Sequence, residues 1–136
     1  MTVGRNNKIK NRRTAPPFSR QPHHVTDSDN YRNLSDKAKS LLWDTNARYR
    51  GSNNGDFDFS LKTMQKWGRN SNDTITKAKN ELLRKGWLVL TRQGGRNKCN
   101  LYALTFWSID ECNGKLDRGA TKNSLDYWKQ GVNPEI

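Results

Sequence analysis

The fold of this chain is decided by residues 60–98, which read SLKTMQKWGRNSNDTITKAKNELLRKGWLVLTRQGGRNK. This stretch contains ten Lys or Arg residues and two acidic residues, Asp73 and Glu81, so ten minus two gives it a net charge of +8. The whole chain carries +12, and the other residues therefore supply only +4. Positive charge gathered on one short segment is typical of a surface that binds a polyanion. Nucleic acid is the first partner that this pattern predicts.

The first part of the stretch has the pattern of a short helix followed by a turn. Leu61, Met64 and Trp67 are spaced three apart, which predicts one buried helix face. Ser60 is suited to cap the start of this helix, and Gly68 is suited to end it. We therefore expect a helix that begins after Ser60 and stops before Gly68.

A longer amphipathic helix follows the turn. Ser71 or Asn72 is placed to cap its start, and Gly86 follows Arg84 and Lys85 at its end. Its apolar residues are Ile75, Ala78, Leu82 and Leu83. Its opposite face consists of Asp73, Thr76, Lys77, Asn80, Glu81 and Arg84. Because such polar side chains are not expected in a core, this face is available to a ligand.

Two apolar runs around a glycine-containing tip predict a β-hairpin. Residues 87–92 and 100–107 are rich in Leu, Val, Tyr and Trp, and the polar residues between them include Gly94 and Gly95. The aromatic residues in these runs are expected in the core rather than stacked on bases. They are Trp87, Tyr102, Phe106 and Trp107. Residues 56–59 alternate polar and apolar, so we expect a short strand that pairs with the hairpin.

One more helix is predicted before the short strand, over residues 33–50. Its apolar stripe is formed by Leu34, Ala38, Leu41, Leu42 and Thr45. Ser35 or Asn33 is placed to cap its start, and an Asn-Gly turn within residues 51–55 follows its end. These elements together predict one domain over residues 33–110.

Both ends of the chain differ from this domain in composition. Residues 1–32 contain seven Lys or Arg, three prolines and few apolar residues, which predicts a disordered, flexible basic arm. Residues 111–136 are a polar C-terminal extension in which a short helix is expected over 123–130. Leu125 and Trp128 lie on one side of that helix, where they would either form a homodimer interface or fold back on the domain.

The order of these elements resembles the winged helix-turn-helix family. The resemblance rests on LKTMQKW (61–67), the turn through Asn70, residues 74–88 and RQGGRNK (92–98), which look like helix 2, the turn, the recognition helix and the wing. The run RQGGRNKCNLYALTFWSIDECNGKLD (92–117) is also similar to small helix-turn-helix proteins of phages, plasmids and integrated mobile elements. The implied fold class is α+β, with three helices, a small antiparallel sheet with its β-hairpin wing, and the basic arm.

The resemblance implies which residues bind DNA. In this family the second helix of the motif enters the major groove, and the wing lies on the backbone or in the minor groove. The recognition-helix residues are then Ser71, Asn72, Thr74, Thr76, Lys77, Asn80 and Arg84. The wing residues are Arg92, Gln93, Gly94, Gly95, Arg96, Asn97 and Lys98. The turn and arm residues are Lys66, Arg69, Asn70, Arg12 and Arg13.

The predicted function is sequence-specific binding of double-stranded DNA. The resemblance implies a transcriptional regulator or replication-origin binder of a mobile element, cytoplasmic and associated with a bacterial nucleoid. Two alternatives stay open: a winged helix that binds a protein and inhibits a nucleic-acid-processing complex, and a non-specific nucleic-acid binder that acts mainly through its arm. Because the sequence has no secretory signal and no membrane-spanning run, a soluble intracellular protein without a membrane partner is expected.

Catalysis is not predicted. The sequence has no phosphate-binding glycine loop, zinc-hydrolase pattern or nucleophile elbow, and no cofactor is expected. Asp56 and Asp58 share a strand face, but no further ligand converges on them. The adjacent histidines, His23 and His24, and the two cysteines, Cys99 and Cys112, match no metal-site spacing. We therefore expect neither an enzyme nor a bound metal.

Overall fold

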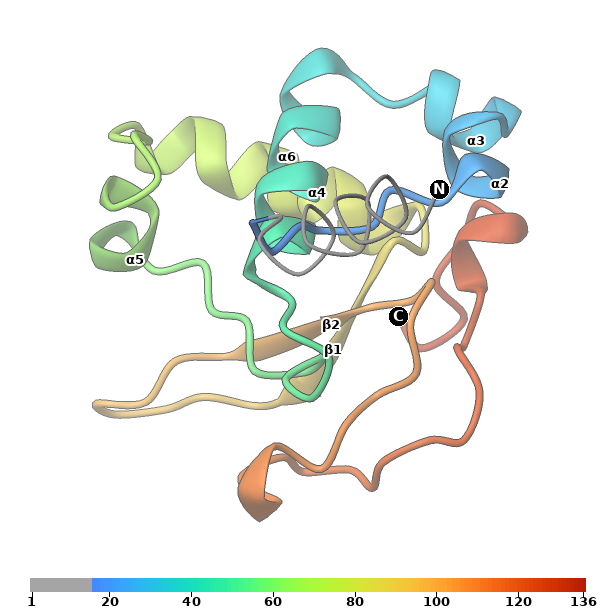
Figure 1. Ribbon diagram of the computed structural model, residues 1–136. Helices are drawn as coiled ribbons and strands as arrows, with labels where there is room; N and C mark the ends of the chain where they lie inside the picture. The colour runs from blue at the N-terminus through green and yellow to red at the C-terminus, as the bar shows by residue number, and fades with distance from the viewer. Residues whose placement is uncertain (1–15) are drawn as a thin grey trace, which may run out of the picture.

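The computed structural model describes residues 16–136 and has an α+β architecture (Figure 1). Its helices are α2 (His23–Thr26), α3 (Asp29–Arg32), α4 (Asp36–Arg48), α5 (Leu61–Gln65) and α6 (Asn72–Arg84). Its strands are β1 (Leu88–Arg92) and β2 (Leu101–Leu104), and two short 3₁₀ helices follow, η1 (Cys112–Gly114) and η2 (Tyr127–Lys129). Within residues 16–136, no helix is long and apolar enough to cross a membrane.

The sheet is an antiparallel β-hairpin extended by one bridge. β1 pairs with β2, and Leu90 lies opposite Tyr102. Tyr102 also exchanges two backbone hydrogen bonds with Phe57, at 2.9 and 3.3 Å. The segment expected to be a strand over 56–59 therefore pairs with the hairpin as predicted. It does so through a single bridge, because the chain turns into α5 directly after it.

The core lies between α4, α6 and the hairpin. Ser35 caps α4 by accepting a hydrogen bond from the backbone N–H of Ala38, so the helix starts at Asp36. The predicted apolar faces of α4 and α6 are buried, except that Leu83 is half-buried, which confirms their helical periodicity. The innermost large side chains include Leu41, Leu42, Phe57, Met64, Leu82, Trp87, Leu88 and Leu104. The four aromatic residues of the hairpin region lie in or against this core, as expected.

The structure differs from the prediction for the N-terminal arm. Residues 23–32 form α2 and α3 rather than a flexible segment. Val25 is completely buried, and the side chain of Asn30 donates to the carbonyl oxygens of Trp128 and Lys129 at 2.9 and 3.0 Å. Because the segment is mostly polar, these few contacts with the domain could not be predicted from its composition. The expected arm is therefore too long, and its first 15 residues lie outside the described part of the chain.

The C-terminal extension packs on its own domain. The helix predicted over 123–130 is only the short η2, because Asp126 before it has a left-handed φ of 57°. The Trp128 ring stacks on Trp87 with the ring centroids 5.1 Å apart, and Leu125 packs beside the second apolar cluster around Val89. Figure 1 shows this segment passing beneath the hairpin and returning to α2 and α3. Of the two alternatives predicted for Leu125 and Trp128, the structure has the second, because both side chains pack on their own domain.

Candidate nucleic-acid interface

Capping hydrogen bonds mark the start of both helices of the predicted motif, and a glycine follows the end of the first. Ser60 accepts a hydrogen bond from the N–H of Thr63 at the start of α5, and Ser71 does the same for Thr74 at the start of α6. Gly68 takes a φ of +78° after α5, which lets the chain leave that helix and turn toward α6. The sequence predicted these caps correctly because capping depends on residues close together in the chain.

α6 presents its polar face to solvent. Asn72, Thr76, Lys77, Asn80 and Arg84 are exposed, as the prediction requires. Thr74 is half-buried, and the hydroxyl of Ser71 is engaged as the helix cap. Lys77 forms an ion pair with Asp73 at 3.0 Å, in which both side chains are more than three-quarters exposed. Such an exposed pair is weak, so it leaves the Lys77 ammonium accessible to another anion.

The hairpin tip is a tight turn that exposes its cations. The backbones of Gly95 and Lys98 exchange two hydrogen bonds at 3.0 and 3.1 Å, so Arg96 and Asn97 form the end of the turn. Asn97 has a φ of 59°, a conformation that Asn tolerates better than most residues. Gln93, Gly95, Arg96, Asn97 and Lys98 are all exposed.

The close packing of the hairpin explains why residue 94 is a glycine. A Cβ atom at this position would lie 2.5 Å from the carbonyl oxygen of Lys98 and 2.7 Å from the backbone nitrogen of Asn100. Glycine is therefore needed for the two arms of the hairpin to approach each other. Gly95 has nothing within 4 Å of such a Cβ, and its backbone lies open to a ligand.

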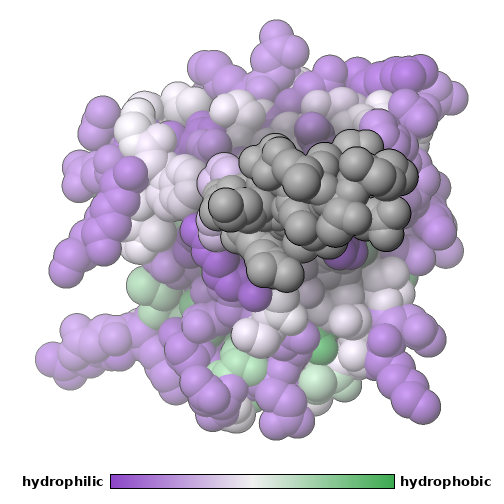
Figure 2. All heavy atoms as spheres, in the orientation of Figure 1, coloured by the Kyte–Doolittle hydropathy of each residue, from purple (hydrophilic) through white to green (hydrophobic). Residues whose placement is uncertain are grey.

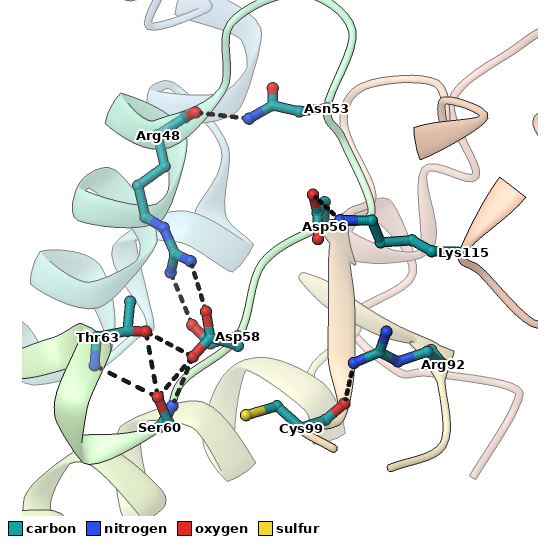
Figure 3. A network of polar contacts seen from close by, with 9 residues as sticks. All are labelled: Arg48, Asn53, Asp56, Asp58, Ser60, Thr63, Arg92, Cys99 and Lys115. Atoms are coloured by element: carbon teal, nitrogen blue, oxygen red, sulfur yellow. Dashed lines mark hydrogen bonds and ion pairs between the residues drawn. The ribbon is translucent and has the colours of Figure 1, made fainter. Parts of the chain in front are cut away.

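Two of the predicted cations are held by acceptors of the protein itself. Arg92 donates from Nη2 to the carbonyl oxygen of Cys99 at 2.8 Å, which joins the two arms of the hairpin (Figure 3). Arg69 pairs with Asp44 on α4 at 2.6 Å and also donates to the hydroxyl of Ser40. These two guanidinium groups position the interface rather than projecting from it. Neither contact could be predicted from the residues nearby in the chain.

Other cations of α5, α6 and the hairpin project into solvent. They are Lys62 and Lys66 around α5, Arg84 on α6, and Arg96 and Lys98 on the hairpin. Among residues 16–136, no carboxylate oxygen lies within 4.0 Å of these five charged groups. Asn70 is also exposed, whereas Arg12 and Arg13 lie outside the described residues. Lys62 was not among the predicted site residues, although its place in the first turn after Ser60 puts it beside the motif.

A shallow hollow lies between α6, the start of α5 and the start of β2. It has a volume of about 220 Å³, and Ser60, Lys79, Cys99 and Asn100 are among the residues that line it. The Lys79 ammonium lies 5.6 Å from the centroid of the Tyr102 ring, which joins α6 to β2. Figure 1 shows α5 and the hairpin tip projecting from the same side of the molecule, and Figure 2 shows hydrophilic side chains along that edge.

The network around Asp58 holds the start of α5 against α4 (Figure 3). The carboxylate accepts from the hydroxyl groups of Ser60 and Thr63 at 2.6 and 2.7 Å and pairs with Arg48 at 3.3 Å. Burial opposes ionisation of Asp58, but these hydrogen bonds and the charge of Arg48 outweigh it and lower the pKa of the carboxyl. Asp56 pairs instead with Lys115 at 3.0 Å, so the two carboxylates serve separate ion pairs.

Trp67 departs from its predicted place in the buried face of α5. Its side chain is 37% exposed, whereas Met64 is buried. The helix ends at Gln65, so the spacing of three no longer places residue 67 on the buried side. An exposed aromatic ring consequently lies in the turn between α5 and α6.

Comparisons with known proteins add no assignment. No protein-family model, curated protein or solved structure matches this chain. Within residues 16–136, no group of three or more His, Cys, Asp or Glu side chains is arranged to hold a metal ion.

Proposed function

We propose that this protein binds double-stranded DNA in a sequence-specific way, with α6 in the major groove and the β1–β2 hairpin on the backbone or in the minor groove. The observation that carries the proposal is that α6 and the hairpin each present exposed polar and cationic side chains. Between the two elements lies a hollow whose lining includes Lys79 of α6 and Asn100 next to β2. A convex helix beside a projecting basic hairpin matches the alternation of groove and phosphate backbone in a duplex.

The order of the elements supports the proposal that the fold is a winged helix-turn-helix. α4, the Phe57 bridge, α5, α6, β1 and β2 follow one another in the order that this family uses. β2 lies between β1 and the Phe57 bridge, since Tyr102 pairs with both Leu90 and Phe57. In this arrangement α6 is the recognition helix, and the hairpin that ends at Arg96 and Asn97 is the wing.

The two parts of the interface have different expected roles. Asn80 and Thr76 on α6 have the hydrogen-bonding groups that read base edges, and Asn pairs well with adenine. Arg96 and Lys98 on the hairpin contribute charge that any DNA sequence attracts. α6 is therefore proposed to provide most of the specificity, and the hairpin most of the affinity.

The biological role that we propose is regulation of transcription, or binding at a replication origin, for a bacterial mobile element, with the protein associated with the nucleoid in the cytoplasm. This step rests on the resemblance of the sequence around the hairpin to small proteins of such elements. The biological role is a separate claim from the binding activity. Mapping the DNA sites that the protein occupies in the cell tests it.

Selection of binding sites from random duplex DNA at physiological salt tests the proposed binding activity. An enriched motif is expected, and the Asn80→Ala variant should lose the preference for one base within it. Selection without enrichment would contradict sequence-specific binding. It would favour one of the alternatives, a non-specific binder or a protein-directed inhibitor.

Deletion of residues 1–15 separates specific binding from binding through the arm. Because Val25 is buried, a deletion that extends to residue 25 would also damage the core, so the cut belongs before residue 16. We expect the shortened protein to retain its preferred motif with lower affinity. Complete loss of duplex binding would favour the arm-driven, non-specific alternative.

A further inference from the structure

A second surface, which shares no residue with α6 or with the hairpin tip, combines aromatic and cationic side chains. It is a groove of about 380 Å³ between the segment 17–20, the end of α4 and Trp107. We call it the α4 groove, and its side chains include Phe18, Arg20, Asn46, Tyr49, Arg50 and Trp107. Its size is sufficient for a small ligand, since such sites start near 300 Å³.

The α4 groove contains a preformed aromatic stack. The rings of Tyr49 and Trp107 are nearly parallel, with an interplanar angle of 19° and centroids 5.5 Å apart. Trp107 is held by a hydrogen bond from Nε1 to the side-chain oxygen of Asn46 at 2.9 Å. Asn46 in turn donates to the carbonyl oxygen of Arg20 at 2.7 Å, which fixes the segment 17–20 across the groove. Flat aromatic surface is thus held in place before any ligand arrives.

The charge around the α4 groove suits an anion. Arg20 and Arg50 are exposed, and no Asp or Glu is among the residues that line the groove. Within residues 16–136, neither guanidinium lies within 4.0 Å of a carboxylate. The phenol of Tyr49 is a hydrogen-bond donor at neutral pH, and burial and the nearby Asp110 raise its pKa further above its ordinary value. The groove therefore combines flat rings, cations and a donor.

We infer that the α4 groove binds single-stranded DNA, with a base against its aromatic rings and the flanking phosphates on Arg20 and Arg50. Single-strand sites in proteins combine these two features, aromatic faces for the bases and positive charge for the backbone. The inference does not rest on the proposed duplex interface, because none of the groove residues belongs to α6, β1, β2 or the hairpin tip. The two sites together would hold the paired and unpaired forms of DNA on one small domain.

Fluorescence anisotropy of the full chain with labelled ten-residue oligothymidylate and with a labelled duplex tests this inference. The charge variant is Arg20→Ser with Arg50→Ser, in which only exposed side chains change. The carbonyl oxygen of residue 20 still accepts from Asn46, and the backbone N–H of residue 50 still donates to Asn53. Loss of two phosphate contacts should reduce the salt slope of single-strand binding by about 1.4. In the aromatic variant, Tyr49→Ala, loss of one base stack should weaken single-strand binding roughly ten-fold.

A matched control removes the same charge elsewhere. Arg32→Ser with Lys122→Ser changes two exposed cations that do not line the groove and should leave oligothymidylate binding within about two-fold. Duplex binding should be unchanged in both groove variants and weakened in Arg96→Ala with Lys98→Ala. Equal oligothymidylate binding by wild type and the charge variant would overturn the inference. Equal loss in the control, or thymidine monophosphate that binds as tightly as the oligonucleotide, would also overturn it.

Discussion

Arg69 and Asp44 join the turn before α6 to the middle of α4. Both Nε and Nη2 of the guanidinium donate to the same carboxylate oxygen, at 3.1 and 2.6 Å. The Arg69 side chain is 17% exposed and that of Asp44 is 34% exposed, so water screens this pair less than it screens a surface pair. The contact ties the turn before α6 to α4, and we expect it to help hold α6, and with it the proposed recognition face, in position.

Arg69→Ala should destabilise the protein by about 1 to 2 kcal/mol, because it leaves the Asp44 carboxylate with fewer charge-assisted hydrogen bonds. Urea unfolding of the single variants and the double variant with Asp44→Ala measures the coupling energy between the two residues. The pair Asp73 and Lys77 is a suitable control, because it is exposed and should contribute less than about 0.5 kcal/mol. Equal coupling energies for both pairs would contradict a positioning role for Arg69.

Substitutions in the two parts of the interface should have different effects on DNA binding. Arg96→Ala with Lys98→Ala should weaken duplex binding for every sequence, because it removes charge that is exposed at the hairpin tip. Asn80→Ala should instead cost about 1 to 3 kcal/mol for the preferred base and little for the others. Binding measured on a panel of single-base duplex variants checks both. A hairpin variant that binds like wild type would contradict the proposed wing.

The affinity for duplex DNA should fall steeply with salt. If the exposed cations neutralise six to ten phosphates, the binding constant should drop by about 10³ to 10⁵ between 50 and 200 mM monovalent salt. Titrations across this range give the number of contacts from the slope. A slope near zero would show that the partner of this surface is not a polyanion.

Asp58→Asn should reduce stability at neutral pH but not in acid. The folded-state pKa of Asp58 is lowered, so its carboxylate stabilises the fold above about pH 4, and this stabilisation is lost as the pH falls through the folded pKa. At pH 7 the variant should be less stable by about 1 to 2 kcal/mol, since the amide replaces a charged acceptor of three hydrogen bonds. Urea unfolding at several pH values should show the two proteins converging below pH 4. A constant difference across that range would contradict this assignment.

Trp128→Ala should show that the C-terminal extension belongs to the domain. Trp128 is 3% exposed and stacks on Trp87, so its truncation leaves a large cavity and should cost about 3 to 5 kcal/mol. Val132→Ala, at a side chain that is 54% exposed, should change stability by less than about 0.5 kcal/mol. Thermal unfolding of both variants measures this contrast. A Trp128 variant that stays stable but loses self-association would instead favour the other alternative, a homodimer interface at this segment.

The sequence by itself determined α4, α6 and the hairpin, and also the charge of the surface that they form. Each of these features depends on residues close together in the chain. Apolar residues recur with the period of a helix, and Ser35, Ser60 and Ser71 each cap the helix that follows them. The exposed face of α6 was predictable for the same reason, because its polar residues occupy the side opposite the apolar stripe.

The tertiary structure decided which segments join the core and which cations remain available. The buried side chain of Asn54 donates to the carbonyl oxygens of Leu104 and Ser108, and such a contact across some fifty residues leaves no periodic signal. Val25 and Trp128 likewise lie in polar segments and are buried only because distant residues surround them. In the sequence Arg69 is one more cation near Lys62 and Lys66. In the part of the chain that the structure describes, it alone of the three pairs with a carboxylate, that of Asp44 on α4. Composition sets how much charge a chain has, whereas its three-dimensional contacts decide which charges remain exposed to a ligand.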